Sequence, residues 1–323
     1  MYKDIRISST EFISILTDMH FIYKDKEALI LPYFGVIQHT WDILLRSPSG
    51  ICKHTILFSG KKITAICSSW RSSTNCWCVQ NGVAYNIRDY VRAIVLLSYK
   101  LIEDPSASYI QTWFRPGNTI VCKMCGLDSP LCNIDGVYSD VNSCLLWTPQ
   151  TKFGEIGDLT LLAGRVVDKT AFKSFIIGNR SSLFYEEENF ADDPSFENVN
   201  KLFHKAGLTH RRKIDVISSS SGIQAVILSY FSSPGINFSF LENRTEIIVG
   251  RNVAITSGLI ALIGETVRKR EKERIVPSPI ITERRTGNAL ISNGAILQRE
   301  YERYIWNRDT YKKLYEYITN KYM

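Results

Sequence analysis

Residues 75–114 read NCWCVQNGVAYNIRDYVRAIVLLSYKLIEDPSASYIQTWF, and this stretch decides the fold. Its first six residues favour a strand, which Asn81-Gly82 then interrupts. Apolar residues recur at helical spacing through 86–103 and predict a long helix with one buried face. Asp104-Pro105 ends that helix, and residues 108–114 favour a second strand. The stretch therefore predicts a strand, a long helix and a strand, in that order.

Shorter segments on both sides of this stretch complete the first half of the chain. Residues 54–59 and 62–71 predict two strands ahead of it. Arg115-Pro116-Gly117-Asn118 predicts a turn after it. The elements expected next are a short helix up to Gly126 and strands near 133–138 and 144–148.

The second half of the chain repeats this order of elements. The segments are helix 196–206, strands 212–218, 223–231 and 236–242 with a continuation through 245–249, helix 256–273, strand 275–282, a short helix, strand 300–306 and a helix from 308. Two local echoes support a duplication. They are Val79-Gln80-Asn81 with Leu241-Glu242-Asn243, and Arg115-x-Gly117-Asn118 with Arg285-x-Gly287-Asn288. The prediction is an α+β protein with an N-terminal domain (1–150), a connector that starts the second domain (151–195) and a C-terminal domain (196–323).

Length and composition agree with two ordinary globular domains. The 323 residues exceed what one core usually organises, and 45% hydrophobic with 22% charged residues excludes disorder, collagen and coiled coil. Lys and Arg exceed Asp and Glu by 39 to 32, so the net charge of +7 suits anionic ligands or an acidic carrier protein, but not a nucleic-acid binder. The N-terminus does not resemble a secretory signal, and the longest uncharged run, 216–241, is broken by Pro234-Gly235. We therefore expect a cytoplasmic protein without a membrane span.

The element order resembles the GCN5-related N-acetyltransferase (GNAT) fold, in which a mixed, mostly antiparallel sheet is flanked by helices. Both halves resemble it, so the chain resembles a tandem acyltransferase. The resemblance implies an acyl thioester donor, from CoA or an acyl carrier protein, in a gap between two splayed strands. It also implies that the start of the long helix binds the donor's pyrophosphate, and that Asn118 or Asn288 supports the donor's arm. Neither half contains the family's usual Q/R-x-x-G-x-G/A loop.

The resemblance implies a donor site in the second half and a set of catalytic side chains. Donor contacts are expected from Gly250, Arg251, Asn252, Thr256, Ser257, Gly258 and Asn288, with Arg284 and Arg285 as further cations. Glu242 is the candidate general base, and the matching Gln80 in the first half cannot act as one. Tyr304 and Tyr301 are the candidate acids for the leaving thiolate. Alternating strand residues face opposite ways, so at most one of them points to the site easily, and Tyr304 is favoured. Tyr138 is their first-half counterpart, and His39 is a further candidate base at the acceptor site.

Several readings of the function stay open at this point. The leading expectation is N-acyl transfer to an amine. A narrower resemblance, to fatty-acyltransferase-like members of the superfamily, suggests a fatty acyl donor and a Lys or ornithine side chain of a precursor peptide. The alternatives are an acetyl-CoA-dependent acetyltransferase and a non-catalytic binding protein. No metal is expected, because Cys122-x-x-Cys125 with Cys132 lacks an obvious fourth ligand. The oligomeric state, a homodimer included, is left open.

Overall fold

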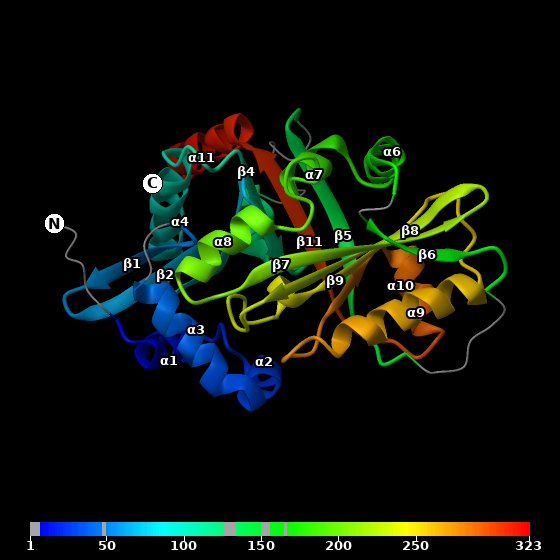
Figure 1. Cartoon of the computed structure of the whole chain (residues 1–323). Helices are drawn as coiled ribbons and strands as arrows, with labels where there is room; N and C mark the ends of the chain where they lie inside the picture. Colours follow the sequence, from blue (N-terminus) through cyan, green and yellow to red (C-terminus); the bar gives the residue numbers. More distant parts are fainter. Residues whose placement is uncertain (1–6, 47–49, 126–133, 150–155, 165–166) are drawn as a thin grey trace.

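The computed structural model describes residues 7–46, 50–125, 134–149, 156–164 and 167–323. Its strands form one mixed sheet in the order β1-β2-β3-β4-β11-β5-β10-β9-β8-β7-β6 (Figure 1). They are β1 (Cys52–Ser59), β2 (Lys62–Arg71), β3 (Cys76–Ala84), β4 (Tyr109–Phe114), β5 (Val137–Leu146), β6 (Thr160–Ala163), β7 (His210–Ser219), β8 (Gly222–Ser232), β9 (Thr245–Val249), β10 (Ile280–Thr282) and β11 (Ile296–Asn307). The α+β class is confirmed.

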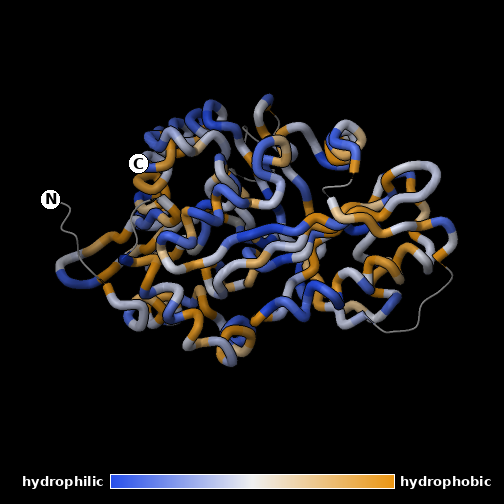
Figure 2. Tube along the Cα trace, in the orientation of Figure 1, coloured by the Kyte–Doolittle hydropathy of each residue, from blue (hydrophilic) through white to orange (hydrophobic). Residues whose placement is uncertain are grey.

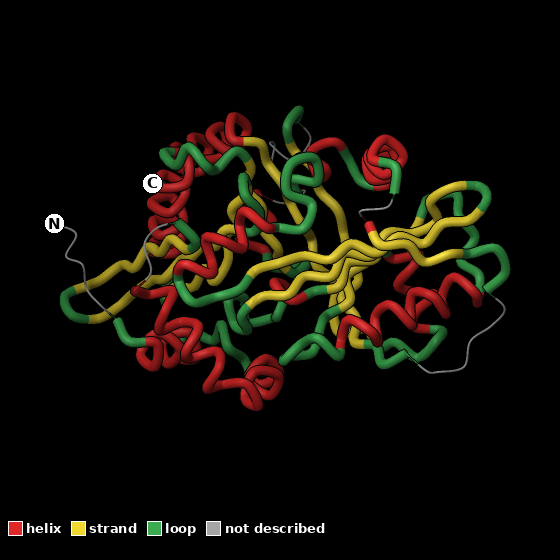
Figure 3. Tube along the Cα trace, viewed as in Figure 1, coloured by secondary structure: helices red, strands yellow, loops and turns green. Residues whose placement is uncertain are grey.

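Helices cover both faces of this sheet (Figure 3). They are α1 (Ser9–Asp18), α2 (Lys24–Ile30), η1 (Leu31–Tyr33), α3 (Phe34–Arg46), α4 (Ile87–Ile102), α5 (Thr119–Cys125), α6 (Lys169–Asn179), α7 (Ser182–Glu187), α8 (Glu197–Lys205), η3 (Leu241–Asn243), α9 (Ser257–Glu271), α10 (Arg284–Ile291) and α11 (Arg308–Tyr322). Helices α1, α3, α7 and α8 share one large core on one face. On the opposite face, α4 and α11 pack over the first half, and α9 packs over the second.

The long helix of each half follows directly from its sequence. Asn86 caps α4 by accepting a hydrogen bond from the Asp89 backbone N–H at 2.9 Å, and Thr256 caps α9 in the same way through Leu259 at 3.2 Å. The N-terminal half of α9 is hydrophobic and its last turns are hydrophilic (Figure 2). Burial of that apolar half, which includes Leu259, holds the helix on the sheet.

The two halves meet by exchanging their last strands. Strand β11 of the second half lies between β4 and β5, and β5 of the first half lies between β11 and β10. The register shows a local two-fold relationship in the residue pairs Thr112 with Tyr304, Thr282 with Ser143, and Glu302 with Val141. Glu302 with Val141 is the central pair. Thr112 lies opposite Tyr304, two positions after Glu302, and Thr282 lies opposite Ser143, two positions after Val141. The ladder of β4 with β11 and the ladder of β10 with β5 are therefore equivalent, as a duplication requires.

A pair of hydrogen bonds repeats across the same relationship. Thr112 donates through Oγ1 to the Val79 carbonyl at 3.1 Å, and Thr282 donates to the Ile247 carbonyl at 2.8 Å. Each bond joins two parallel strands, β3 to β4 and β9 to β10, at the last pair of their ladder. Each half therefore has the same junction, beyond which its parallel strands are no longer paired.

Some predicted elements differ from the structure. Residues 236–242 are not a strand: the third strand of the second half is β9, and Glu242 lies in η3 before it. In the ladders, β3 and β9 align Val79 with Ile247, so the echo between Gln80 and Glu242 is wrong and Gln80 corresponds to Ile248. Arg115 and Arg285 do occupy equivalent positions, three residues after the end of their ladders. Their backbone conformations differ, because Arg285 lies within α10.

Further differences concern boundaries. Only 280–282 of the strand expected over 275–282 is paired, and β5 runs continuously where two strands near 133–138 and 144–148 were expected. Helices α1 to α3 were not predicted, and the expected connector 151–195 contains β6, α6 and α7. Because both halves share one sheet, the proposed domain boundaries remain a prediction.

One stretch of the described chain, Lys24–Arg46, has the length and apolar composition of a membrane span, with a mean hydropathy of 1.2 over its most apolar part. It comprises α2, η1 and α3 in succession. Ile37, Trp41 and Leu44 of α3 are buried in the main core, and 28% of the most apolar part of this stretch is buried in all. A single such stretch is weak evidence for a span.

Candidate functional site

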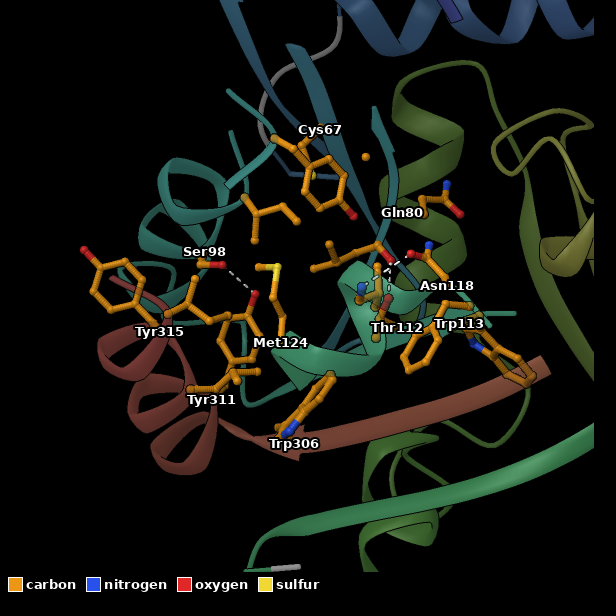
Figure 4. A pocket seen from close by; sticks show the side chains of 18 of the residues that line it. Cys67, Gln80, Ser98, Thr112, Trp113, Asn118, Met124, Trp306, Tyr311 and Tyr315 are labelled. Carbon is orange, nitrogen blue, oxygen red and sulfur yellow. Dashed lines mark hydrogen bonds between the residues drawn. The ribbon is translucent and has the colours of Figure 1, made fainter. Parts of the chain in front are cut away.

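A cavity of about 140 Å³ lies where β3 and β4 of the first half diverge (Figure 4). Their ladder ends at the pair Val79 and Thr112, after which β3 continues beside β2 as far as Ala84. Side chains from α4, α5 and α11 complete most of the wall. The cavity therefore occupies the C-terminal end of two parallel strands, the usual place for ligands in sheets of this kind.

A β-bulge shapes the β3 side of this cavity. Ser68 of β2 pairs with Gln80, and Ile66 pairs with Val83, so two residues of β3 stand opposite Cys67 alone. Gly82 is one of these two, and a Cβ there would lie 3.1 Å from the Tyr90 ring. A Cβ at this position would require the Tyr90 ring to shift by a few tenths of an ångström.

The rest of the wall is largely apolar. Tyr90, Ile94 and Ser98 project from one stripe of α4, spaced four residues apart. At one end, the hydroxyl groups of Ser98 and Tyr311 share a hydrogen bond of 2.8 Å, which links α4 to α11 (Figure 4). The lining also includes Phe21, from the loop between α1 and α2 on the opposite face. The cavity is thus reached by side chains from both faces of the sheet.

Polar groups suited to an extended ligand border this apolar space. Beyond Val79 and Thr112, the facing edges of β3 and β4 have no ladder partner in each other. Free backbone N–H and C=O groups on such edges can pair with the amides of an inserted chain. The start of α4 lies at the end of the same strand, with exposed Arg88 on its first turn. A long helix begun in this way suits an anionic group.

At the corresponding strand ends of the second half, Arg285 bridges β9 and α10 with an exposed side chain. Its guanidinium donates to the Gly250 carbonyl at 2.7 Å and to the Arg251 carbonyl at 2.8 Å, with a longer bond of 3.3 Å to Val253. These carbonyls belong to the turn after β9, and Arg285 projects from α10 after β10. The arginine therefore ties together the two strand ends that diverge in the first half.

The structure brings the predicted donor residues to one region but engages several of them in the fold. The Gly250 N–H bonds to the Gln224 carbonyl at 2.9 Å, and the Arg251 N–H donates to Asn179 Oδ1 at 2.7 Å. Thr256 is the N-cap of α9, Ser257 is exposed and Gly258 is buried. Asn252 and Asn288 are exposed, and Asn288 lies on α10. Arg284 forms an exposed ion pair with Glu300 at 2.8 Å. These residues lie around the strand ends that Arg285 bridges.

Glu242 is completely buried and holds a loop rather than facing a cleft. Its Oε1 accepts from the Gly235 N–H at 2.9 Å, and burial raises its pKa to about 8. The Gly235 carbonyl accepts from Trp41 Nε1 at 2.7 Å. One residue further on, the Ile236 carbonyl accepts from Gln80 Nε2 at 2.6 Å. This loop of the second half thus fixes Gln80 at the edge of the first-half cavity, a link that sequence spacing does not show.

Tyr301 and Tyr304 face opposite sides of the sheet, as their spacing predicts. Tyr304 is buried with Phe114 and Trp306, two residues that line the cavity, and its ring stacks on both. Tyr301 lies on the other face, edge-on to Trp113 at 6.5 Å. Burial raises the pKa of Tyr301. Tyr304 therefore contacts two residues of the cavity lining, and Tyr301 contacts one.

Other predicted candidates lie away from the cavity. Tyr138 donates to Asp140 at 3.1 Å on the face opposite α4, and His39 is an exposed residue of α3. Asn118 does line the cavity and caps α5, accepting from the Val121 N–H at 3.3 Å. Cys132 and the side chain of Cys125 lie outside the described residues. Among the residues that are described, no cluster of three or more potential metal ligands occurs.

Sequence reasoning missed most of the cavity wall, including Phe21, Cys67, Tyr90 and Ile94. The signal for part of it was available: Tyr90, Ile94 and Ser98 recur every four residues on a predicted helix. The helical periodicity of this segment predicts only a buried face, because cavity-lining and core residues have the same periodicity.

No protein-family model and no curated protein matches this chain. Solved structures with a similar fold include a GCN5-related N-acetyltransferase-like protein from Streptococcus suis, with 12% identity, a TM-score of 0.42, and coverage of 84% of this chain and 93% of that one. A tandem GNAT protein of the clavulanic acid biosynthesis pathway has 9% identity, a TM-score of 0.41 and coverage of 94% and 97%. A Drosophila protein has 11% identity, a TM-score of 0.46 and coverage of 94% and 98%. Similarity at this level does not assign an activity.

Proposed function

We propose that this protein transfers an acyl group from a CoA-type thioester to an amine, and that the donor binds in the first half. The observation that carries the proposal is the apolar cavity between the diverging strands β3 and β4, next to the start of α4. In the second half, where the donor was expected, Arg285 bonds to the Gly250 and Arg251 carbonyls at the equivalent strand ends.

The arm of CoA matches the chemistry of this cavity. The pantetheine arm is an extended chain that carries two amides between short apolar segments. Its amides suit the unpaired edges of β3 and β4, and its apolar parts suit the wall formed by Ile94 and Met124. The pyrophosphate would then lie at the start of α4, near Arg88.

The size of the cavity favours a short acyl group over a fatty one. An apolar protein cavity of roughly 150 Å³ holds a molecule the size of benzene. The 140 Å³ available here is therefore suited to a short segment of the donor with a small acyl group. We propose an acetyl or similarly short acyl donor, instead of the fatty acyl thioester that the narrower resemblance suggests.

The reaction needs an amine nucleophile and stabilisation of the oxyanion. The amine nitrogen forms a bond to the thioester carbonyl carbon, the C–S bond breaks, and the amine proton leaves while the thiolate gains one. Backbone N–H groups at the open edge of β3 are suited to the oxyanion. Tyr304 and Tyr301 remain candidate proton donors to the thiolate. The complete burial of Glu242 and its bond to Gly235 favour a positioning role over that of the general base.

Calorimetric titration with CoA and acetyl-CoA tests the donor site. Ile94→Trp fills the cavity and is expected to weaken CoA binding by at least about ten-fold. Tyr99→Trp, on the exposed side of the same helix, is the matched control and should bind as the wild type does. Equal CoA affinity in both variants would remove the donor from this cavity.

Acyl transfer itself is tested by mass spectrometry of amine acceptors after incubation with acetyl-CoA and a long-chain acyl-CoA. We expect a mass increase of one acetyl group on the acceptor and none from the long-chain donor. Binding of CoA without transfer to any class of amine would instead support the non-catalytic binding protein.

A further inference from the structure

Three cationic side chains converge on the ring of Tyr23. Arg115 Cζ lies 4.5 Å from the ring centroid, Lys26 Nζ lies 5.3 Å away and Arg299 Cζ lies 6.0 Å away. Arg299 also donates through Nη1 to the Tyr23 hydroxyl. The three cations come from distant parts of the chain: α2, the turn after β4, and β11. We call these three side chains the Tyr23 cluster.

The Tyr23 cluster has no acidic partner in the part of the chain that the structure describes. None of its cations forms an ion pair with a carboxylate there, although the chain contains 32 acidic residues. Lys26 is only 7% exposed, and its ammonium lies over the Phe21 ring at 3.9 Å. Burial, followed by the charge of Arg299, lowers the pKa of Lys26 to about 7. A buried cation without a counter-ion is costly, so a bound anion would stabilise this cluster.

The cluster lies beside the proposed site of transfer. Phe21, under the Lys26 ammonium, lines the 140 Å³ cavity. Arg299 lines a second, smaller cavity of about 40 Å³ together with Ser239 and Tyr301. Tyr301 in turn contacts Trp113, which lines the larger cavity. The Tyr23 cluster therefore contacts the lining of both the 140 Å³ cavity and the 40 Å³ cavity.

The position of the cluster also separates it from the donor's phosphates. Phe21 and α2 belong to the face covered by the N-terminal helices, whereas α4 packs on the opposite face. An anion at the cluster would therefore approach from the side on which an acceptor can reach the thioester. Arginine pairs well with carboxylates because two of its N–H groups can bond to the two oxygens.

We propose that the acceptor amine carries a carboxylate, which Lys26, Arg115 and Arg299 bind while the amine reaches the cavity. This inference rests on the proposed function, since it names the class of acceptor for the same site. Amino acids and short peptides with a free carboxylate near the reacting amine belong to this class.

Acetylation rates for matched acceptors test the proposal. Each amine is offered as the free acid and as the primary amide, with acetyl-CoA as donor. In the wild type, the KM of the amide should exceed that of the acid by about ten-fold or more. Arg299→Gln and Lys26→Met should bring this ratio close to one, without a comparable change in the KM for acetyl-CoA. Arg211→Gln, an arginine of β7 over the Phe231 ring, is the control and should keep the preference. Equal KM values in the wild type, or a preference retained in both cluster variants, would overturn the proposal.

Two further titrations separate this proposal from the proposed function. CoA and dephospho-CoA should bind Arg299→Gln as they bind the wild type; a loss confined to CoA would show that the cluster binds the donor's phosphate and would overturn the carboxylate assignment. If the wild type binds no CoA, the proposed function fails by itself. The cluster is then tested directly with N-acetylglycine and its amide, by the intrinsic tryptophan fluorescence of the protein, to which Trp113 contributes. Saturable quenching by the acid alone, absent in Arg299→Gln, would support the carboxylate site, and no difference between acid and amide would refute it.

Discussion

Arg285 occupies in the second half the position that Arg115 occupies in the first, but the two guanidinium groups have different partners. Each follows the last residue of its ladder, Thr282 or Thr112, by three positions. Arg285 donates to the backbone carbonyls after β9. Arg115 lies over the Tyr23 ring on the other side of its strand end and leaves the first-half cavity open. The same residue type at equivalent positions therefore has different partners in the two halves.

Arg285→Ala should lower the free energy of unfolding by about 1–2 kcal/mol, because it removes hydrogen bonds from a charged donor to three carbonyls at a partly exposed site. Urea unfolding measures the change. Arg284→Ala is the matched control: its ion pair with Glu300 is exposed, so the expected loss is within about 0.5 kcal/mol. Donor affinity should be unchanged in both. A loss of CoA binding in Arg285→Ala would place the donor in the second half.

Glu242→Gln should change how stability depends on pH. The pKa of Glu242 is raised by burial to about 8 from an ordinary 4.5, so the folded state binds the proton more tightly than the unfolded state. The wild type should therefore lose stability as pH rises from about 4.5 to 8. Glu242→Gln lacks this term, so it should gain about 1–4 kcal/mol relative to the wild type between pH 5 and pH 8. Urea unfolding at several pH values measures it, and parallel curves would contradict the raised pKa.

Gly235→Ala should displace the loop that holds Gln80. Gly235 has a φ of 90°, and a Cβ there would lie 2.6 Å from Ile37 Cγ2. Gly222→Ala is the matched control, since Gly222 has a φ of 108° but no heavy atom within 4 Å of the added Cβ. Both lose the freedom of glycine, and the clash should make Gly235→Ala less stable than Gly222→Ala by about 1–3 kcal/mol. Equal thermal unfolding would show that the loop adjusts without cost.

Arg303→Met should be the most destabilising of these changes. Arg303 is completely buried and pairs with Asp140 at 2.6 Å and with Glu246 at 3.0 Å, which together with Arg180 holds the pKa of both carboxyl groups below their usual values. Removal of the cation leaves two buried carboxylates with only longer contacts to Arg180 and Arg244, at a cost of about 3–5 kcal/mol. Partial rescue at pH 4–5, where the carboxyl groups take up protons, should accompany the loss. A loss below about 1 kcal/mol would show that the network does not hold the centre of the sheet.

Local patterns predicted the elements that repeat but not those that depend on the other half. The strands from 54 to 71, the helix of 86–103 and the strand of 108–114 match β1, β2, α4 and β4 closely, because periodicity and breakers define them. Residues 236–242 have the alternation of a strand but form a loop: the Ile236 carbonyl accepts from Gln80, and the Gly235 carbonyl just before it accepts from Trp41, both of the first half. A contact between residues more than 150 positions apart leaves no periodic trace.

By itself, the sequence determined that two copies of one element order follow each other, because hydrophobic periodicity and turn residues act over short distances. The equivalent ladders and threonine bonds of the two halves agree with this reading. Only the tertiary structure decided how the two copies differ. The difference between the halves depends on which carbonyls the Arg285 side chain bonds to and on the exchange of β5 and β11 between the halves. Both depend on contacts between segments far apart in the chain.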